Sequence, residues 1–214
     1  MDIPTNWTFQ TDDVAQSFDR HVREQLPWYE LVIGAVAHIA RHYITDGATV
    51  YDLGCATGQI GRSLADAIAK RRVTFLPIDN SEAMARAYVG PGEVVVADVG
   101  AVQFVPFDVA ISFLCLSFLP TADRRAVLLR LRHARKVGGV IIVVDKTESR
   151  GGYLGSALSR LALAGKVATH VPASEIIAKE LSLVGVQRPL EQVEIGKATE
   201  VFRFGDFAGW VIDK

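Results

Sequence analysis

The sequence predicts a three-layer α/β fold, in which a doubly wound and mostly parallel sheet lies between helices. Two observations carry this prediction. From residue 49 to residue 145, short β-branched runs alternate with stretches whose apolar side chains recur every three or four residues. After residue 145 this alternation stops, and the end of the sequence has the pattern of an antiparallel hairpin.

Length and composition fit one globular domain. Of the 214 residues, 50% are apolar and 22% are charged. The formal net charge of -1 provides no field that would hold nucleic acid or an anionic membrane, so we expect neither as a tight direct partner. Cys55 and Cys115 are too few for a disulfide framework and are not spaced as metal ligands. The polar start and the short apolar runs predict a cytoplasmic protein without a membrane span.

The first part of the chain is predicted to be helical. Residues 5–43 carry four apolar side chains at every fourth position, which would line one helix face: Val14, Phe18, Val22 and Leu26. Pro27 interrupts this pattern, and residues 31–42 resume it as a second helix. We therefore expect a single domain over residues 1–214, with residues 1–45 as a helical lid.

Strands and helices alternate in the central part. Strands are expected at residues 49–53, 73–79, 93–97, 109–113 and 139–145. Helices are expected at residues 60–70, after a cap at Ser81, and at residues 123–135. Connections of this length predict parallel crossovers.

The last part of the chain follows a different plan. Residues 151–168 are expected to be helical in part, and residues 174–184 form a helix that Gly185 ends. Residues 201–204 and 207–212 would pair as an antiparallel hairpin around the turn at 205–206.

Polar residues follow the predicted strands at one edge of the sheet, where ligands bind in open α/β folds. They are Asp52, Gly54, Asp79, Asn80, Asp98 and Ser112. Asp79 lies about 20 residues beyond the glycines, the distance at which an acidic group meets ribose hydroxyls. Asp98 would accept a hydrogen bond from an adenine amine, and Met84 would lie against the ring. Taken singly, the glycine loop could be a plain connection, residues 79–81 a helix cap, Asp98 a turn residue and Met84 a core residue. Their combination nevertheless predicts a nucleoside cofactor.

The loop at residues 50–58 favours one cofactor over another. A dinucleotide needs Gly-x-Gly-x-x-Gly, which lets the pyrophosphate sit on a helix N-terminus. Here Gly54 and Gly58 are separated by Cys55-Ala56-Thr57, and no basic residue of the loop compensates. A ligand with a sulfonium and an amino acid tail fits better, and Asp52 would orient it. The sequence therefore predicts S-adenosylmethionine or S-adenosylhomocysteine.

Residues 51–58 (YDLGCATG) resemble the first motif of class I S-adenosylmethionine-dependent methyltransferases. Asp79 and Asp98 resemble that family's second and third acidic positions. The strand pattern, with its reversed terminal hairpin, is similar to the family's seven-stranded sheet with an antiparallel last strand. The resemblance implies a Rossmann-like methyltransferase fold and methyl transfer to an acceptor that the sequence does not identify.

A narrower resemblance is to the carboxy-S-adenosylmethionine synthase group, which acts in tRNA wobble-uridine modification. It is carried by residues 7–9, 14–15, 18, 27–29, 51–55, 78–81, 84, 118–119, 138–139 and 202–205. It implies cofactor contacts from Tyr29, Gly54, Cys55, Ala56, Asp79, Asn80, Asp98 and Val99. Two positions depart from the group: Ser112 and Glu180 stand where it has the asparagine and the arginine that hold the extra carboxylate. A carboxylate in place of a guanidinium turns attraction into repulsion.

Three functions therefore stay open: a methyltransferase, a carboxy-S-adenosylmethionine synthase-like enzyme of tRNA modification, and a non-catalytic cofactor-binding protein. A homodimer is left open as well. No catalytic residue is assigned, because displacement at a sulfonium methyl requires alignment but no obligatory base. Five further side chains could face the pocket: His21, Tyr29, Lys146, Glu148 and Tyr153. For each of them, a surface or core role is favoured. The expected cofactor site comprises Tyr29, Asp52, Gly54, Cys55, Ala56, Gly58, Asp79, Asn80, Met84, Asp98, Val99 and Ser112.

Overall fold

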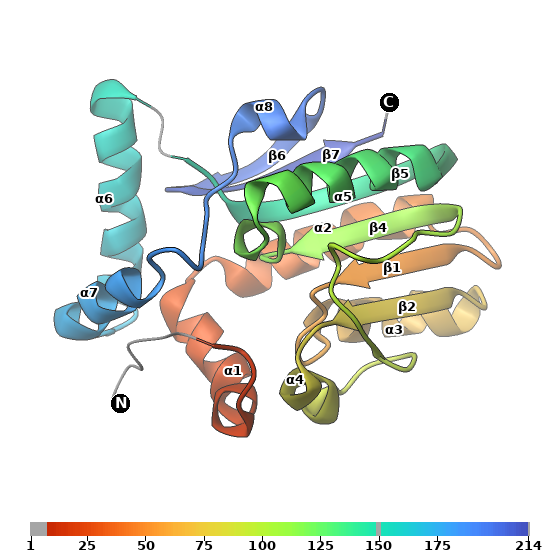
Figure 1. Cartoon of the computed structure of the whole chain (residues 1–214), viewed down its shortest axis with the longest axis horizontal. Helices are drawn as coiled ribbons and strands as arrows, with labels where there is room; N and C mark the ends of the chain where they lie inside the picture. The colour runs from red at the N-terminus through yellow and green to blue at the C-terminus, as the bar shows by residue number, and fades with distance from the viewer. Residues whose placement is uncertain (1–7, 149–150, 214) are drawn as a thin grey trace.

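The computed structural model describes residues 8–148 and 151–213, and a seven-stranded sheet runs through its centre (Figure 1). Its strand order is β3-β2-β1-β4-β5-β7-β6. The strands are β1 (Thr49–Leu53), β2 (Thr74–Asp79), β3 (Val95–Val96), β4 (Phe107–Phe113), β5 (Arg135–Lys146), β6 (Thr199–Phe204) and β7 (Phe207–Ile212). The first five run parallel, and β7 is antiparallel to both β5 and β6. The predicted fold class is confirmed.

Helices cover both faces of the sheet. They are α1 (Asp12–Gln25), α2 (Tyr29–Tyr43), α3 (Gln59–Lys70), α4 (Glu82–Ala87), η1 (Leu116–Phe118), α5 (Thr121–Ala134), α6 (Gly152–Ala168), α7 (Ala173–Ser182) and α8 (Gln192–Ile195). Successive strand residues point to opposite faces, so β1 sends Val50 into a core beneath α2 and α3 and Tyr51 into a second core beneath α5. Among the described residues, no helix is both long and apolar enough to cross a bilayer.

Several predicted bounds change in the structure. The break at Pro27 is confirmed, because α1 ends at Gln25 and α2 begins at Tyr29. The predicted start of the first helix at residue 5 lies outside the described residues, as does Trp7 in the resembling segment 7–9. Residues 152–168 form one complete helix rather than a partial one. Strand β5 begins at Arg135, earlier than residue 139, because it pairs with Phe107 ahead of a register shift.

Helix α8, which the sequence did not predict, is held by a buried ion pair with α5. Arg124 donates from Nε to Oε1 of Glu194 at 2.8 Å and from Nη2 to Oε2 at 2.5 Å. Their side chains are 2% and 0% exposed. Glu194 also closes a capping box with Glu191 at the start of α8. Burial is the largest influence on the pKa of Glu194 and would raise it, but the hydrogen bonds from Arg124 and from the Glu191 N–H, together with the charges of Arg124 and Arg125, outweigh burial and lower the pKa.

Removing the cation of this pair tests how much it contributes. Arg124→Met should lower the free energy of unfolding by about 3–5 kcal/mol, because Glu194 keeps a buried charge, loses its two-bonded partner and retains only the longer contact from the half-exposed Arg125 at 3.3 Å. Guanidinium unfolding measures the change. The double variant Arg124→Met/Glu194→Leu should recover much of the loss, and Lys70→Met, which breaks an exposed pair with Asp66, should have little effect. If Arg124→Met matched Lys70→Met, the buried pair would not hold α8.

Candidate functional site

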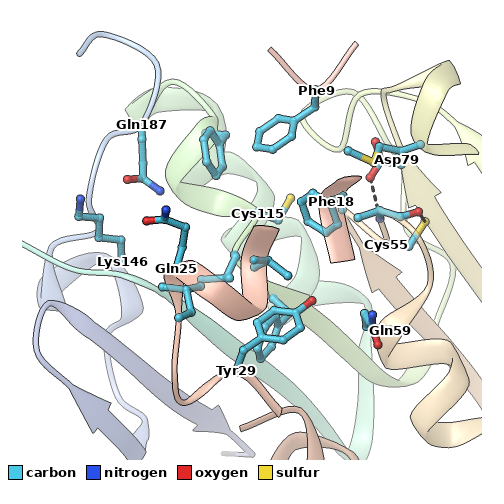
Figure 2. A pocket seen from close by; sticks show the side chains of 18 of the residues that line it. Phe9, Phe18, Gln25, Tyr29, Cys55, Gln59, Asp79, Cys115, Lys146 and Gln187 are labelled. Atoms are coloured by element: carbon cyan, nitrogen blue, oxygen red, sulfur yellow. Dashed lines mark hydrogen bonds between the residues drawn. The ribbon is translucent and has the colours of Figure 1, made fainter. Parts of the chain in front are cut away.

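A pocket lies where the parallel strands end, and it brings together most of the residues that the sequence singled out (Figure 2). The paired positions Leu53, Ile78 and Ser112 show why, since β1, β2 and β4 finish side by side at one edge. Of the predicted site residues, Gly58 and Ser112 do not line the pocket. The other ten do: Tyr29, Asp52, Gly54, Cys55, Ala56, Asp79, Asn80, Met84, Asp98 and Val99.

The loop after β1 exposes bare main chain to the pocket. Gly54 has φ +69°, and a Cβ there would lie 2.8 Å from the Cβ and Sγ of Cys115, so only glycine fits. Gly58, with φ +94°, precedes α3 and packs against Tyr88. It therefore shapes the loop without lining the pocket.

Asp79 ties the loop to the end of β2. Its Oδ2 accepts a hydrogen bond from the Ala56 N–H at 2.9 Å, and its Oδ1 accepts one from the Ser81 N–H at 2.9 Å. The first bond holds Ala56 at φ +45°, a conformation that costs a non-glycine residue about 1–2 kcal/mol. Burial raises the pKa of Asp79, although these main-chain bonds oppose it. The helix-cap interpretation is correct for Ser81, whose Oγ accepts from the Met84 N–H at 3.1 Å.

Asp52 is the acid of the site whose charged form has the least favourable surroundings. It is 1% exposed, and burial followed by the charge of Asp79 raises its pKa to about 8. Within residues 8–148 and 151–213, its buried Oδ2 has no hydrogen-bond partner. A buried carboxylate oxygen without a donor is rare unless a ligand supplies one. The arrangement fits a ligand with a positive charge or a strong donor.

The adenine end of the predicted site combines polar and apolar residues. Asp98 shapes the turn after β3, since its Oδ1 accepts from the Gly100 N–H at 2.7 Å, and it also lines the pocket. Met84 and Val99 are 1% and 5% exposed, so each belongs both to the core and to the pocket wall. Tyr29 is also buried, and burial raises the pKa of its hydroxyl.

Ser112 does not reach the pocket because of the strand pleat. Its neighbour Phe113 belongs to the core beneath α2 and lines the pocket, so Ser112 points to the opposite face of β4. It is 1% exposed there.

The pocket extends beyond the predicted residues to an end built by α1, β5, α6 and α7. Its polar side chains are His21, Gln25, Lys146, Lys166, Lys179, Glu180 and Gln187. Of the pocket-facing candidates, His21 and Lys146 do line it, whereas Tyr153 is 83% exposed. Sequence reasoning missed Gln25, Lys166, Lys179 and Gln187, since no local pattern distinguishes them from solvated helix residues.

Glu180 lies between two cations in this part of the pocket. Its Oε2 is 3.1 Å from Nζ of Lys146 and its Oε1 is 2.7 Å from Nζ of Lys166. Burial would raise its pKa, but the two lysines outweigh burial and lower it to about 2. The repulsive carboxylate expected from the sequence is therefore neutralised by residues distant in the chain.

Comparisons with known proteins concern the domain and the fold. Residues 50–139 match a family described as a methyltransferase domain. The chain is 25% identical to a carboxy-S-adenosyl-L-methionine synthase of Staphylococcus epidermidis over 97% of this chain and 92% of that protein. It is 28% identical to one of Shewanella pealeana, over 94% of this chain and 87% of that protein.

Solved structures share the fold. Magnesium protoporphyrin IX methyltransferase of Synechocystis, with bound S-adenosylhomocysteine, superposes with a TM-score of 0.57 at 14% identity, covering 88% of this chain and 84% of that one. A TehB-like methyltransferase of Corynebacterium glutamicum superposes with a TM-score of 0.53 at 17% identity, covering 95% and 100%.

Fold, pocket and domain match together define a Rossmann-like, S-adenosylmethionine-dependent methyltransferase. Residues 50–139 carry the matched methyltransferase domain, and the cofactor is S-adenosylmethionine. Over most of its length the chain is similar to carboxy-S-adenosyl-L-methionine synthases.

The raised pKa of Asp52 predicts a pH-dependent stability. Its ordinary value is 3.8 and its folded value about 8, so the folded state favours the protonated acid. The stability that this proton contributes is complete below about pH 4 and is lost as the pH rises through 8. Without ligand, Asp52→Asn should therefore gain melting temperature over the natural protein progressively from pH 4 to pH 8, then keep a constant lead.

Thermal melts across this range, with Asp66→Asn on the exposed face of α3 as the control, measure the difference. A lead that did not change with pH would mean that Asp52 is not held protonated by its surroundings.

Proposed function

We propose that the acidic and glycine positions at the strand ends hold the cofactor, and that an acceptor enters the remaining part of the same pocket to take the methyl group. Asp79 binds the ribose hydroxyls and Asp98 the adenine amine. Asp52 faces the positively charged part of the cofactor. The observation that carries the proposal is the buried Oδ2 of Asp52, which has no hydrogen-bond partner among residues 8–148 and 151–213 and belongs to a carboxyl group that the charge of Asp79 influences.

The residues fit this cofactor in charge and shape. Bare main chain at Gly54 lets a ligand lie close to the loop, and Asp52 needs a positive partner or a proton. When bound, the cofactor supplies a methyl group already activated by its sulfonium. The chain's own task is then to align the acceptor and exclude water. The apolar wall from Tyr29, Phe18 and Phe113 serves the second purpose.

Residues 1–45 serve as a lid within a single domain; of the described residues, α1 and Phe9 make the contacts of the lid, while α2 packs against the sheet. Asp19 of α1 accepts hydrogen bonds from Oγ1 of Thr57 and from Nη2 of Arg62, the second at 3.0 Å, which fastens the lid to the cofactor loop. Further toward the N-terminus, the carbonyl of Phe9 accepts from Oγ of Ser81 at 2.6 Å. Both contacts join the lid to residues beside the proposed cofactor positions.

The acceptor is a small molecule or an accessible group of a larger one. Arg71 and Arg72, a candidate basic patch, follow α3 at the edge of the sheet opposite the pocket, and Arg72 pairs with Asp46 at 2.8 Å. Because they lie at the opposite edge, these arginines offer little to a phosphate backbone beside the pocket.

A second candidate is synthesis of a carboxylated cofactor, which the similarity to carboxy-S-adenosyl-L-methionine synthases favours. Lys146 and Lys166 supply cations near the position of the group's arginine, although Glu180 occupies that position and lines the pocket. Mass spectrometry of the ligand that copurifies with the protein separates the candidates. The ordinary cofactor supports methyl transfer, and a carboxylated one supports the synthase.

A non-catalytic binding role has less support. The pocket continues from the proposed cofactor positions to the residues of α6 and α7, which leaves room for a second molecule.

Removing the acid proposed for ribose binding tests the cofactor site. Asp79→Ala should weaken S-adenosylhomocysteine binding at least about tenfold in calorimetry, because it deletes a charge-assisted hydrogen bond. Asp79→Asn, which can still accept from the Ala56 N–H, separates loss of the charge from loss of loop order. Asp66→Ala is the surface control. Unchanged affinity in both Asp79 variants would remove this residue from the cofactor site.

A further inference from the structure

Two histidines lie one turn apart on the exposed side of α2, outside the pocket. His38 and His42 are separated by four positions, the spacing that makes side chains neighbours on a helix surface. Both are exposed, whereas the opposite side of α2 packs into the core through Val32, Val36 and Ala40. Neither histidine lines the pocket, so the proposed cofactor and acceptor positions do not use them.

The two imidazoles face each other through the same ring nitrogen. Nε2 of His42 lies 3.4 Å from Nε2 of His38. The ring centroids are 5.0 Å apart and the ring planes are inclined at 69°, so the rings meet edge to face and do not stack. This separation exceeds the length of an ordinary N–H hydrogen bond, about 2.7–3.2 Å, so a shared proton would hold the pair weakly.

The distance between the two nitrogens suits a zinc ion. Zinc binds imidazole nitrogen at about 2.0–2.1 Å and prefers tetrahedral geometry. Two ligands at that distance and at the tetrahedral angle are about 3.3 Å apart, close to the 3.4 Å between the Nε2 atoms. Two ligands at right angles, as an octahedral ion of similar size requires, would be about 2.9 Å apart. The pair therefore needs little rearrangement to bind zinc.

The surroundings of the pair leave room for a bound ion. Side chains of a helix lean toward its N-terminus, and Gly34, one turn before His38, has open space where a side chain would be. Arg41 is the cation beside the pair in the sequence, and its Nη2 donates to the Ser63 carbonyl of α3 at 2.6 Å. Its side chain is therefore already engaged with the neighbouring helix.

The chain supplies two ligands to such an ion. Among residues 8–148 and 151–213, no group of three or more His, Cys, Asp and Glu side chains could hold a metal ion. Water would fill the other coordination positions, so zinc would exchange more readily than at a structural site with four protein ligands. Imidazole nitrogen also favours zinc over magnesium and calcium, which prefer oxygen ligands.

We propose that His38 and His42 form a zinc site on the exposed side of α2, with the two Nε2 atoms as ligands and water completing the coordination. The ion links successive turns and stabilises the last part of α2. His42 lies 13 residues after the pocket residue Tyr29, about 20 Å along the helix. The zinc site is thus separate from the proposed cofactor site, and either can be wrong without the other.

The test titrates the full chain, freed of metal, with zinc chloride at about pH 7.5, where imidazole is mostly neutral. Calorimetry should show one saturable site with a Kd below about 0.1 mM that excess magnesium does not compete for. His38→Gln and His42→Gln should each weaken zinc binding at least about tenfold, because one imidazole remains. His133→Gln removes an exposed histidine of α5 that has no second histidine one turn away, and it should leave binding unchanged.

Nuclear magnetic resonance identifies the ligands directly. In protein with ¹⁵N-labelled histidine, zinc should shift the Nε2 resonances of His38 and His42 and leave that of His133 in place. Without zinc, the His38→Gln and His42→Gln variants should melt at the temperature of the natural protein, because both side chains are exposed. Added zinc should then raise the melting temperature of the natural protein and of His133→Gln, but not of the other two variants.

The absence of saturable zinc binding would overturn the proposal. So would zinc binding that survives in both His38→Gln and His42→Gln, since the ion would then be held by other groups, such as the free thiols of Cys55 and Cys115. A zinc-dependent shift at only one of the two Nε2 atoms would also contradict it, because the pair would not act as a chelate.

Discussion

The burial of two carboxylates at one edge of the sheet is the constraint on which this site depends. Asp52 and Asp79 end neighbouring parallel strands, and their charges oppose each other at low dielectric. Main-chain N–H groups of the loop and of Ser81, the residue that caps α4, satisfy Asp79. Asp52 has no such support within the described residues, so a proton or a cationic ligand must supply it. The glycine loop, its left-handed residues and the lid contacts are all arranged around that edge.

The opposite end of the pocket balances charge in the reverse sense. There, Lys146 and Lys166 neutralise the carboxylate of Glu180. If Glu180 alone were compared with the arginine of the similar synthases, the change would suggest that the site had lost its ability to bind a carboxylate. The structure shows that positive charge near this position comes from β5 and α6 instead. The unit that matters is the summed charge of the cluster, not the identity of one residue.

The sequence predicted the strands and the cofactor end of the pocket, because short local patterns define both. Buried strands have β-branched runs, and residues at their carboxyl ends must converge, so Asp52, Asp79 and Asp98 could be assigned to one pocket before any coordinates. Helix α8 could not be found because four residues show no periodicity, and its partner Arg124 resembled part of a solvated helix face. Lys166 and Lys179 escaped notice because their burial depends on how α6 and α7 pack against α1, β6 and each other beside the sheet. The pleat of β4 directs Ser112 away from the pocket. The sequence did not show which residues of this strand face the pocket side of the sheet and which face the other side.

The antiparallel end of the sheet has a consequence for how the protein is made. Strand β7 is the last in the chain but lies inside the sheet, between β5 and β6, with Trp210 completely buried. During synthesis, the edge of β5 stays open until residues 207–212 have left the ribosome. The loop and acids of the nucleoside end are all translated by residue 99, long before the lysines at 166 and 179. The two ends of the pocket are therefore synthesised in a fixed order, and the hairpin of β6 and β7, which follows both, completes the sheet.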